Sequence, residues 1–142
     1  MKTFKNVRYR LPFILLVLFA LVVGLFVVPY FANIVMPWQK AGAISTALNW
    51  GGLADLPRQS NHISVEMKGS MFTREYIVRF TADSTEINDW LNRCKRIKGN
   101  IPVVEADRQI KYNIYPGENG TIGGTIQVDK EKGRVVIDMS HS

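Results

Sequence analysis

Few side chains in this sequence could carry out chemistry, and they are widely spaced. His62 and His141 lie far apart and have no cysteine or acidic residue at the spacing of a metal site. No serine is framed by the glycines of a nucleophile elbow. Glu75 and Asp138 fall in segments that alternate as strands do, where carboxylates usually form a solvated face. The sequence therefore predicts no metal, no cofactor and no catalytic residue, and it favours a protein that is not an enzyme.

Two residues are candidates for binding a ligand or a partner. Arg74 is a charged residue among the apolar residues of an expected strand, and Tyr115 is an aromatic residue beside an expected turn. The aliphatic stem of Arg74 can pack on the core while its head reaches water, which is a purely structural role. A guanidinium held on a sheet can also bind a carboxylate or a phosphate group.

The elements that would position Arg74 are two strands of a hairpin. Residues 62–68 alternate between apolar and polar side chains and predict a half-buried strand. Gly69 and Ser70 fit a two-residue loop that leads into a second strand at residues 72–82. The expected register places three pairs opposite each other: Met67 with Phe72, Val65 with Arg74, and Ile63 with Tyr76.

A helix is expected to begin after Asp83 or Ser84, either of which can cap its first turn, and Glu86 completes a pattern similar to a capping box. Its buried stripe recurs at helical spacing: Ile87, Trp90, Leu91, Cys94 and Ile97. Cys94 is expected to be a small core residue rather than a nucleophile. Four basic residues before Gly99 suit the negative end of the helix dipole or, alternatively, an anionic lipid or polyanion: Arg93, Lys95, Arg96 and Lys98.

Three more strands are expected in the last third of the chain, at residues 110–114, 122–128 and 135–139. Residues 101–105 fit either a short edge strand or a loop. The glycine pair at residues 123–124 indicates a bulge or the close approach of another backbone. The sequence therefore predicts an α+β domain at residues 61–142, in which an antiparallel sheet with the order β-β-α-β-β-β packs on one helix.

An apolar segment without a charged side chain precedes this domain, at residues 11–38, and follows a basic head at residues 1–10. From Leu11 to Val28 a helix would be roughly 27 Å long at about 1.5 Å per residue, close to the bilayer hydrocarbon core of about 30 Å. The span either ends near Pro29 or bends there and reaches the interface near Trp38. The sequence predicts a single transmembrane helix at residues 11–38, then a linker helix and loop at residues 39–60.

The segment is expected to stay uncleaved as a signal-anchor, because its apolar run is longer than that of a signal peptide and no small-x-small cleavage site closes it. Basic residues precede it without an acidic one, so the positive-inside rule places the N-terminus in the cytoplasm. The domain would then lie in the periplasm or outside the cell, held at the cell (inner) membrane. The residues expected at the membrane interfaces are Arg8, Arg10, Tyr30 and Trp38.

The charge of the chain does not indicate nucleic acid as a partner. The four basic residues of the head supply +4 of the net charge of +6, so the rest of the chain carries only +2. Besides the lipid bilayer we expect a protein partner, and the preferred hypothesis is a non-enzymatic interaction or assembly module that meets the partner through a sheet edge or strand face. An extracytoplasmic small-ligand-binding domain and a hydrolase with an unrecognised site stay open as alternatives.

Overall fold

The computed structural model describes residues 5–70, 73–105, 109–116 and 123–141, and for residues 5–10 it describes the backbone alone. The chain divides into two compact units, Met1–Ile34 and Val35–Ser142. The first contains the apolar segment and the second contains the sheet, and each is considered by itself.

The first unit is one continuous helical segment made of α1 (Lys5–Val22), η1 (Val23–Val27) and α2 (Val28–Phe31). The middle part is π-helical, and the N–H of Val28 reaches back to the carbonyl of Val23. A proline ring clashes with the carbonyl four residues before it, and a wider turn directly ahead of Pro29 lets the helix continue past that residue. The helix therefore ends at Phe31, and Trp38 belongs to the second unit.

This helix is long and apolar enough to cross a membrane. The candidate span is Leu11–Phe31, 21 residues with a mean hydropathy of 3.1. About twenty apolar residues match the hydrocarbon thickness of a bilayer. Its large apolar side chains are exposed, as expected for a helix that packs against lipid rather than protein.

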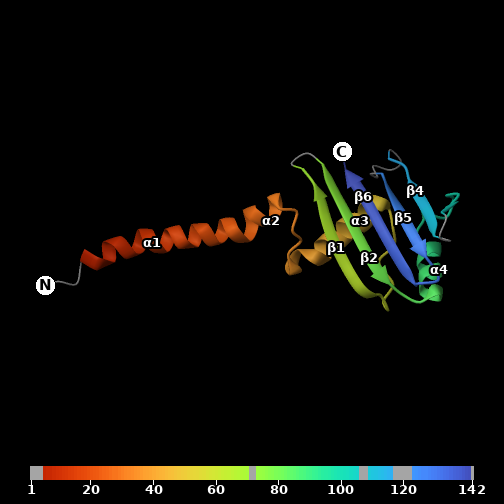
Figure 1. The fold of residues 1–142 in the computed structure, drawn as a ribbon, viewed down its shortest axis with the longest axis horizontal. Helices are drawn as coiled ribbons and strands as arrows, with labels where there is room; N and C mark the ends of the chain where they lie inside the picture. Colours follow the sequence, from red (N-terminus) through yellow and green to blue (C-terminus); the bar gives the residue numbers. More distant parts are fainter. Residues whose placement is uncertain (1–4, 71–72, 106–108, 117–122, 142) are drawn as a thin grey trace. The chain divides into compact units, whose positions relative to one another are not determined.

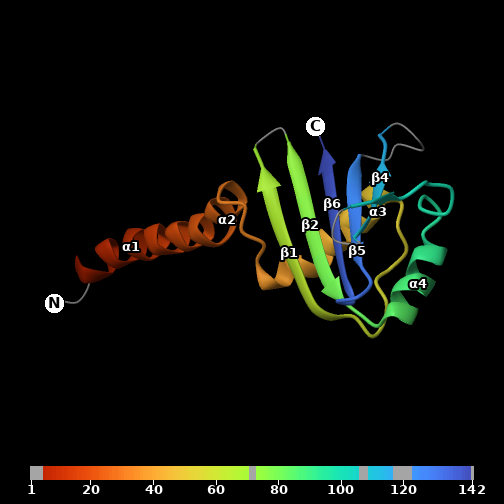
Figure 2. The same cartoon turned by 45° about the vertical axis from the view of Figure 1, so that its right-hand side comes forward.

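The second unit places two helices on one face of a six-stranded antiparallel sheet (Figures 1 and 2). The strand order is β1-β2-β6-β5-β4-β3. A short 3-10 turn, η2 (Pro37–Gln39), leads into the first helix. The elements that follow are α3 (Lys40–Gly51), β1 (Asn61–Gly69), β2 (Arg74–Thr81), α4 (Ser84–Arg93), β3 (Val103–Val104), β4 (Ile110–Ile114), β5 (Gly124–Asp129) and β6 (Arg134–His141).

The core lies between this sheet and the two helices. Trp90 of α4 and Phe80 of β2 are both nearly inaccessible, and their rings meet edge to face at 5.5 Å. Ala47 and Leu48 bring α3 into the same cluster. The α+β class is thus confirmed, while one detail differs from expectation, because two helices cover the sheet rather than one. Of the two alternatives for residues 101–105, the structure has the short edge strand, β3, which is the sixth strand of the sheet.

The register of the β1–β2 hairpin differs from the expected one. The observed pairs include Val65 with Val78, Met67 with Tyr76 and Gly69 with Arg74. The N–H of Ser70 donates to the carbonyl of Thr73 over 2.9 Å, and Gly69, expected in the loop, pairs with Arg74 as the last residue of β1. Because the register shifts by an even number of residues, the expected core face is kept. Phe72 lies outside the described residues.

Helix α4 begins at Ser84 as expected but ends at Arg93, so Arg93 lies in its last turn and the other three basic residues expected there, Lys95, Arg96 and Lys98, lie beyond it. Cys94 leaves the helix with an extended ψ of 98°, and two tight turns follow, closed by Ile97 N–H to Cys94 O and Asn100 N–H to Ile97 O, each at 3.0 Å. Cys94 and Ile97 remain buried. The apolar stripe was therefore correct as a list of core residues but wrong as evidence of helix length.

Gly124 shows why the glycine pair lies within β5. A Cβ atom at Gly124 would overlap the carbonyl oxygen of Asp138 and lie 2.7 Å from the sulfur of Met139. The close approach of the neighbouring strand β6, one of the two expected explanations, thus requires glycine here. The expected turn at residues 116–120 falls largely outside the described residues.

Candidate functional site

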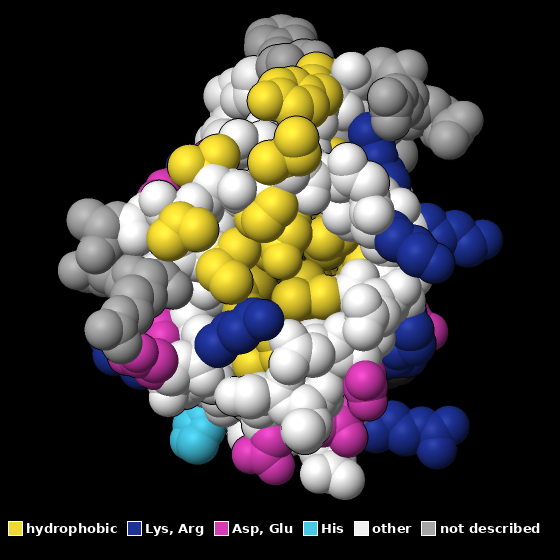
Figure 3. Space-filling view, turned by 90° about the vertical axis from the view of Figure 1, so that its right-hand side faces the viewer, with side chains coloured by type: hydrophobic (Ala, Val, Ile, Leu, Met, Phe, Trp, Pro, Cys, Tyr) yellow, Lys and Arg dark blue, Asp and Glu magenta, His cyan; other side chains and the backbone are white. Residues whose placement is uncertain are grey.

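The most unusual surface of the second unit lies at its β3 edge. Four large apolar side chains are more than half exposed there: Ile101 (87%), Val103 (51%), Val104 (70%) and Tyr115 (70%). We call these four residues the apolar patch. Figure 3 views this end of the molecule and shows hydrophobic side chains gathered around a hollowed surface. Val103 pairs with Lys111 and Val104 with Ile110, so these two side chains point to opposite faces of the sheet and the apolar patch wraps around its edge. Large exposed apolar patches indicate binding surfaces.

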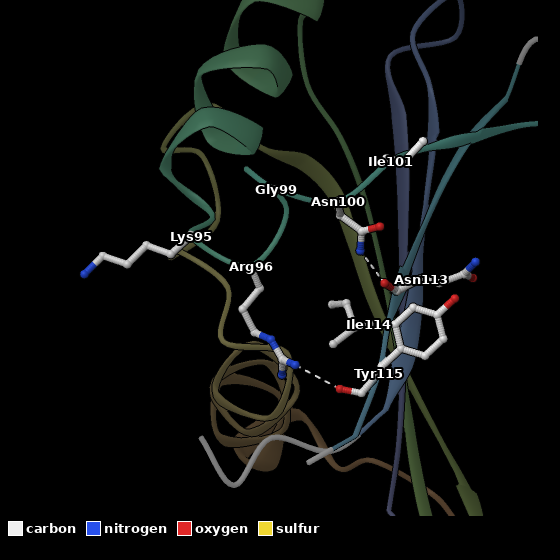
Figure 4. A pocket seen from close by; sticks show the side chains of 8 residues that line it. All are labelled: Lys95, Arg96, Gly99, Asn100, Ile101, Asn113, Ile114 and Tyr115. Carbon is white, nitrogen blue, oxygen red and sulfur yellow. Dashed lines mark hydrogen bonds between the residues drawn. The ribbon is translucent and has the colours of Figure 1, made fainter. Parts of the chain in front are cut away.

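A hollow of about 660 Å³ lies beside the apolar patch. Three segments line it: the turns after α4, the chain that enters β3, and the end of β4. Its residues are Lys95, Arg96, Gly99, Asn100, Ile101, Asn113, Ile114 and Tyr115 (Figure 4). It forms because β3 pairs with only two residues of β4, Ile110 and Lys111, and the chain before β3 leaves the edge of β4.

Two side chains bridge this gap between the turns and β4. Arg96 donates from Nη2 to the carbonyl oxygen of Tyr115 over 2.9 Å, and Asn100 donates from Nδ2 to the carbonyl of Asn113. Asn113 and Tyr115 are two residues apart, so their carbonyls point to the same edge of the strand. Arg96 and Asn100 thus bond to the carbonyls of Tyr115 and Asn113, which lie beyond the two residues of β4 that pair with β3. Their side chains form one wall of the hollow (Figure 4).

Two of the residues that line the hollow, Lys95 and Arg96, are basic. Four basic residues lie within residues 93–98, at the end of α4 and just beyond it: Arg93, Lys95, Arg96 and Lys98. We call these four residues the basic turn. No Asp or Glu occurs in the sequence between Trp90 and Val104. Figure 3 shows Lys and Arg side chains at the margin of the hydrophobic surface. In Figure 4 the side chain of Lys95 points away from the hollow, whereas that of Arg96 points across it towards Tyr115.

The structure does not bring together the two candidate binding residues named from the sequence. Tyr115 belongs to the apolar patch, at the end of β4. Arg74 begins β2 and lies opposite His141, so strands β6 and β5 separate it from β4. Arg74 is half-buried, and its Nη1 lies 3.1 Å from the sulfur of Met67. Arg74 thus lies at the end of a strand, with its guanidinium group in contact with a neighbouring strand.

The residues expected at the membrane interfaces belong to different parts of the chain. Tyr30 lies in the last turn of the apolar helix, is 48% exposed and contacts Phe31 edge to face at 5.5 Å. Trp38 is 59% exposed and lies in η2, at the beginning of the second unit. The side chains of Arg8 and Arg10 lie outside the described part of the structure.

Potential catalytic groups are dispersed. Among the described residues no three His, Cys, Asp or Glu side chains gather as a metal site would require. Cys94 is fully buried, and burial raises the pKa of its thiol, which keeps it protonated and weakly nucleophilic. His62 and His141 are both exposed and lie on strands β1 and β6.

The outer face of the sheet, opposite the helices, carries a pair of carboxylates. Asp138 of β6 and Glu75 of β2 interact across the strands. Burial and the charge of Glu75 raise the pKa of Asp138, and Lys68 and Arg79 oppose this shift only in part. On the same face Glu66 and Arg79 form an ion pair of 2.7 Å. Both carboxylates are half-buried, and the residue opposite Asp138 on β2 is the buried Ile77.

Sequence reasoning named Tyr115 as a candidate binding residue and Lys95 and Arg96 as part of a possible anion-binding surface, but it did not find the other residues of the hollow. The available signal was the run at residues 101–104, which has three large apolar residues and no alternation, because a half-buried strand would have had polar residues between them. Asn100 and Asn113 gave no signal, since their contact joins residues that are not adjacent in any regular pattern. The chain was also compared with known proteins, and no protein-family model, no curated protein and no solved structure matches it.

Proposed function

We propose that this chain is a single-pass membrane protein whose C-terminal domain is a non-enzymatic interaction module that binds a partner protein through the apolar patch. The N-terminus lies in the cytoplasm, and the domain lies in the periplasm or outside the cell. The span Leu11–Phe31 supports the anchor, and the basic head before it supports the orientation through the positive-inside rule.

One observation carries the assignment to binding. Ile101, Val103, Val104 and Tyr115 expose more than half of their surface although the same domain buries a complete core elsewhere. Exposed aliphatic and aromatic side chains at the edge of a sheet are costly in water and favour association or aggregation unless a partner covers them. Aromatic residues and depleted acidic charge are also typical of the centre of protein interfaces.

A second candidate function, small-ligand binding, is favoured by the size of the hollow. Its volume of about 660 Å³ falls within the range of about 300 to 1,000 Å³ that is typical of ligand sites. Arg96 and Tyr115 would supply the polar contacts. The hollow lies open on the surface, however, where a small molecule would stay largely solvated, so we favour a macromolecular partner (Figure 3).

The experiment that tests the proposed function compares proteins that co-purify with the full-length chain after mild detergent extraction of native membranes. The variant Ile101→Ser/Val104→Ser removes two exposed side chains of the apolar patch. Val136→Ser, at a half-buried residue on the outer face of the sheet between Arg79 and Gln127, is the control for a change from valine to serine away from the patch. We expect a stoichiometric partner with the wild type and the control but not with the double variant. Equal recovery of that partner with all three chains, or no partner with the wild type, would contradict the proposal.

A further inference from the structure

The charge around the apolar patch indicates the chemistry of the partner. The basic turn places four cations within six residues, and the sequence from Trp90 to Val104 has no acidic residue to balance them. Arg93, Lys95 and Lys98 are exposed, so their charges act on whatever approaches this surface. Resting on the proposed function, we propose that the apolar patch binds an acidic peptide segment of the partner that carries one aliphatic or aromatic anchor side chain.

The hollow is the place for the anchor side chain. Ile101 and Ile114 give it an apolar wall, and Tyr115 adds an aromatic side chain at its end (Figure 4). Because Ile114 is buried and Arg96 is bonded to Tyr115, the wall is formed in advance and needs no rearrangement. Acidic residues on either side of the anchor would then face the basic turn.

The open edge of β3 suits pairing with a strand of the partner less well than the hollow suits an anchor side chain. The strand has only two residues, Val103 and Val104, and both pair with β4. Pro102 precedes them and has no N–H to donate to an added strand. The partner is therefore recognised mainly by side-chain contacts in the hollow and by charge.

The charge of this surface also excludes a second copy of the chain as the occupant. A symmetric contact between two such surfaces would place one basic turn against another, and like charges brought together in an interface oppose association. An anionic bilayer is negatively charged like the proposed peptide, but it has no single apolar side chain that would enter the hollow. The experiment must therefore distinguish binding of the peptide from binding of anionic lipid.

The probes are three fluorescein-labelled eleven-residue peptides added to the full-length chain in nanodiscs of zwitterionic phosphatidylcholine. The first has a central Leu-Phe flanked by Glu and Asp, the second has Lys and Arg at the acidic positions, and the third has Ser-Ser in place of Leu-Phe. Fluorescence anisotropy measures binding. We expect the first peptide to bind at least about tenfold more tightly than either of the others, because it alone supplies both the anchor and the charge.

Two matched pairs of variants locate the binding. Lys95→Glu/Lys98→Glu reverses two charges of the basic turn, while Arg58→Glu/Lys130→Glu makes the same change in charge at exposed residues of the α3–β1 loop and the β5–β6 turn. We expect a loss of about tenfold or more for the first and less than about threefold for the control. Ile101→Ser, at a side chain that is 87% exposed, should likewise cost about tenfold without affecting folding, and Val136→Ser should not.

Hydrogen exchange of the same nanodiscs separates the peptide from lipid as the occupant. The acidic anchored peptide should slow exchange at residues 101–104 and 113–115, and adding anionic phosphatidylglycerol to the nanodiscs without peptide should not. Protection by anionic lipid alone, equal binding of the acidic and basic peptides, or no binding of any peptide would overturn the inference. If the co-purification partner is still lost in Ile101→Ser/Val104→Ser, the proposed function survives that failure, and the partner is then recognised by another chemistry.

Discussion

The indole Nε1 of Trp90 donates a hydrogen bond of 3.0 Å to the backbone carbonyl oxygen of Ala54. The N–H of Ala54 in turn donates to the sulfur of Cys94 at 3.4 Å, so both polar groups of this loop residue bond to α4 or the residue that ends it. The loop between α3 and β1 is thereby attached to the helix that covers the sheet. These bonds explain why a tryptophan and a cysteine occupy fully buried positions on the stripe of α4.

Trp90→Phe should therefore destabilise the domain. The substitution leaves the carbonyl of Ala54 without its donor and a gap in the core beside Phe80, and we expect a loss of about 2 kcal/mol in the free energy of unfolding. Trp38→Phe is the matched control, since Trp38 is 59% exposed, and its effect should stay within about 0.5 kcal/mol. Denaturant titration followed by circular dichroism makes the comparison, and equal midpoints for the two variants would show that the bond to Ala54 does not stabilise the fold.

A fragment that begins at residue 35 should fold without the apolar helix. Every residue of the core cluster, from Ala47 to Met139, belongs to the second unit, so the helix contributes none of the described core contacts. We expect a soluble monomer with one cooperative thermal transition, measured by circular dichroism and size-exclusion chromatography. An unfolded or insoluble fragment would show that the domain depends on its anchor.

Gly124→Ala should cost about 1 to 3 kcal/mol, because its methyl group would overlap the backbone of β6 at Asp138 and press on Met139. Gly99→Ala is the control: a Cβ atom there meets nothing within 4 Å, and alanine restricts the unfolded chain more than glycine does. The control should be neutral or slightly stabilising in the same denaturant titration. A neutral Gly124→Ala would mean that β5 and β6 are farther apart than the structure shows.

Asp138→Asn should stabilise the domain at neutral pH by a few tenths to about 1 kcal/mol, because it removes a repulsion between carboxylates on neighbouring strands. The pKa of Asp138 is raised in the folded state, so the folded state binds a proton more tightly than the unfolded state does. Stability of the wild type therefore falls as pH rises from about 4 through this raised pKa, and the advantage of the variant should vanish below about pH 4.

Asp129→Asn is the control for that pH dependence, because the pKa of Asp129 is lowered in the folded state whereas that of Asp138 is raised. The hydrogen bond of 2.9 Å from the backbone N–H of Lys132 is the main cause that lowers the pKa of Asp129. Its contribution to stability is present above the unfolded pKa and is lost as pH falls through the folded one. Denaturant titrations of both variants between about pH 3 and pH 8 should thus diverge from the wild type in opposite directions at neutral pH and converge in acid. Parallel curves would contradict both assignments.

The sequence predicted much of the fold, because the spacing of apolar and polar residues indicates which side chains of a helix or strand are buried. The stripe from Ile87 to Ile97 and the alternation in β1, β4 and β6 correctly marked the core side of each element. Patterns could not predict how long each element is. Cys94, where α4 ends, bonds to Ala54, a residue forty positions away, and the hairpin is closed by Ser70 and Thr73, and no apolar period in the sequence reports either contact.

The candidate site was harder to predict than the fold, because it forms where two neighbouring segments of the chain separate. The hollow opens where the chain before β3 leaves β4, and Arg96 and Asn100 bond to carbonyls of that strand. None of these contacts follows a helical or strand period. The four cations of the basic turn are evident in the sequence. They were expected in the last turn of a longer helix, where the helix dipole alone would explain them. Because α4 ends at Arg93, that explanation holds for Arg93 but not for Lys95, Arg96 and Lys98, which lie beyond the helix.

The central claim is that the apolar patch is the surface that meets a protein partner, and site-specific photocrosslinking in native membranes tests it most directly. A benzoylphenylalanine at Ile101 or Val104 is compared with the same residue at Ser64 or Gln127, which lie on the outer face of the sheet. We expect a discrete protein adduct from Ile101 and Val104 and none from Ser64 and Gln127, with the crosslinked partner segment rich in Asp and Glu. Adducts of equal yield from all four positions, or adducts from the outer face alone, would contradict the claim.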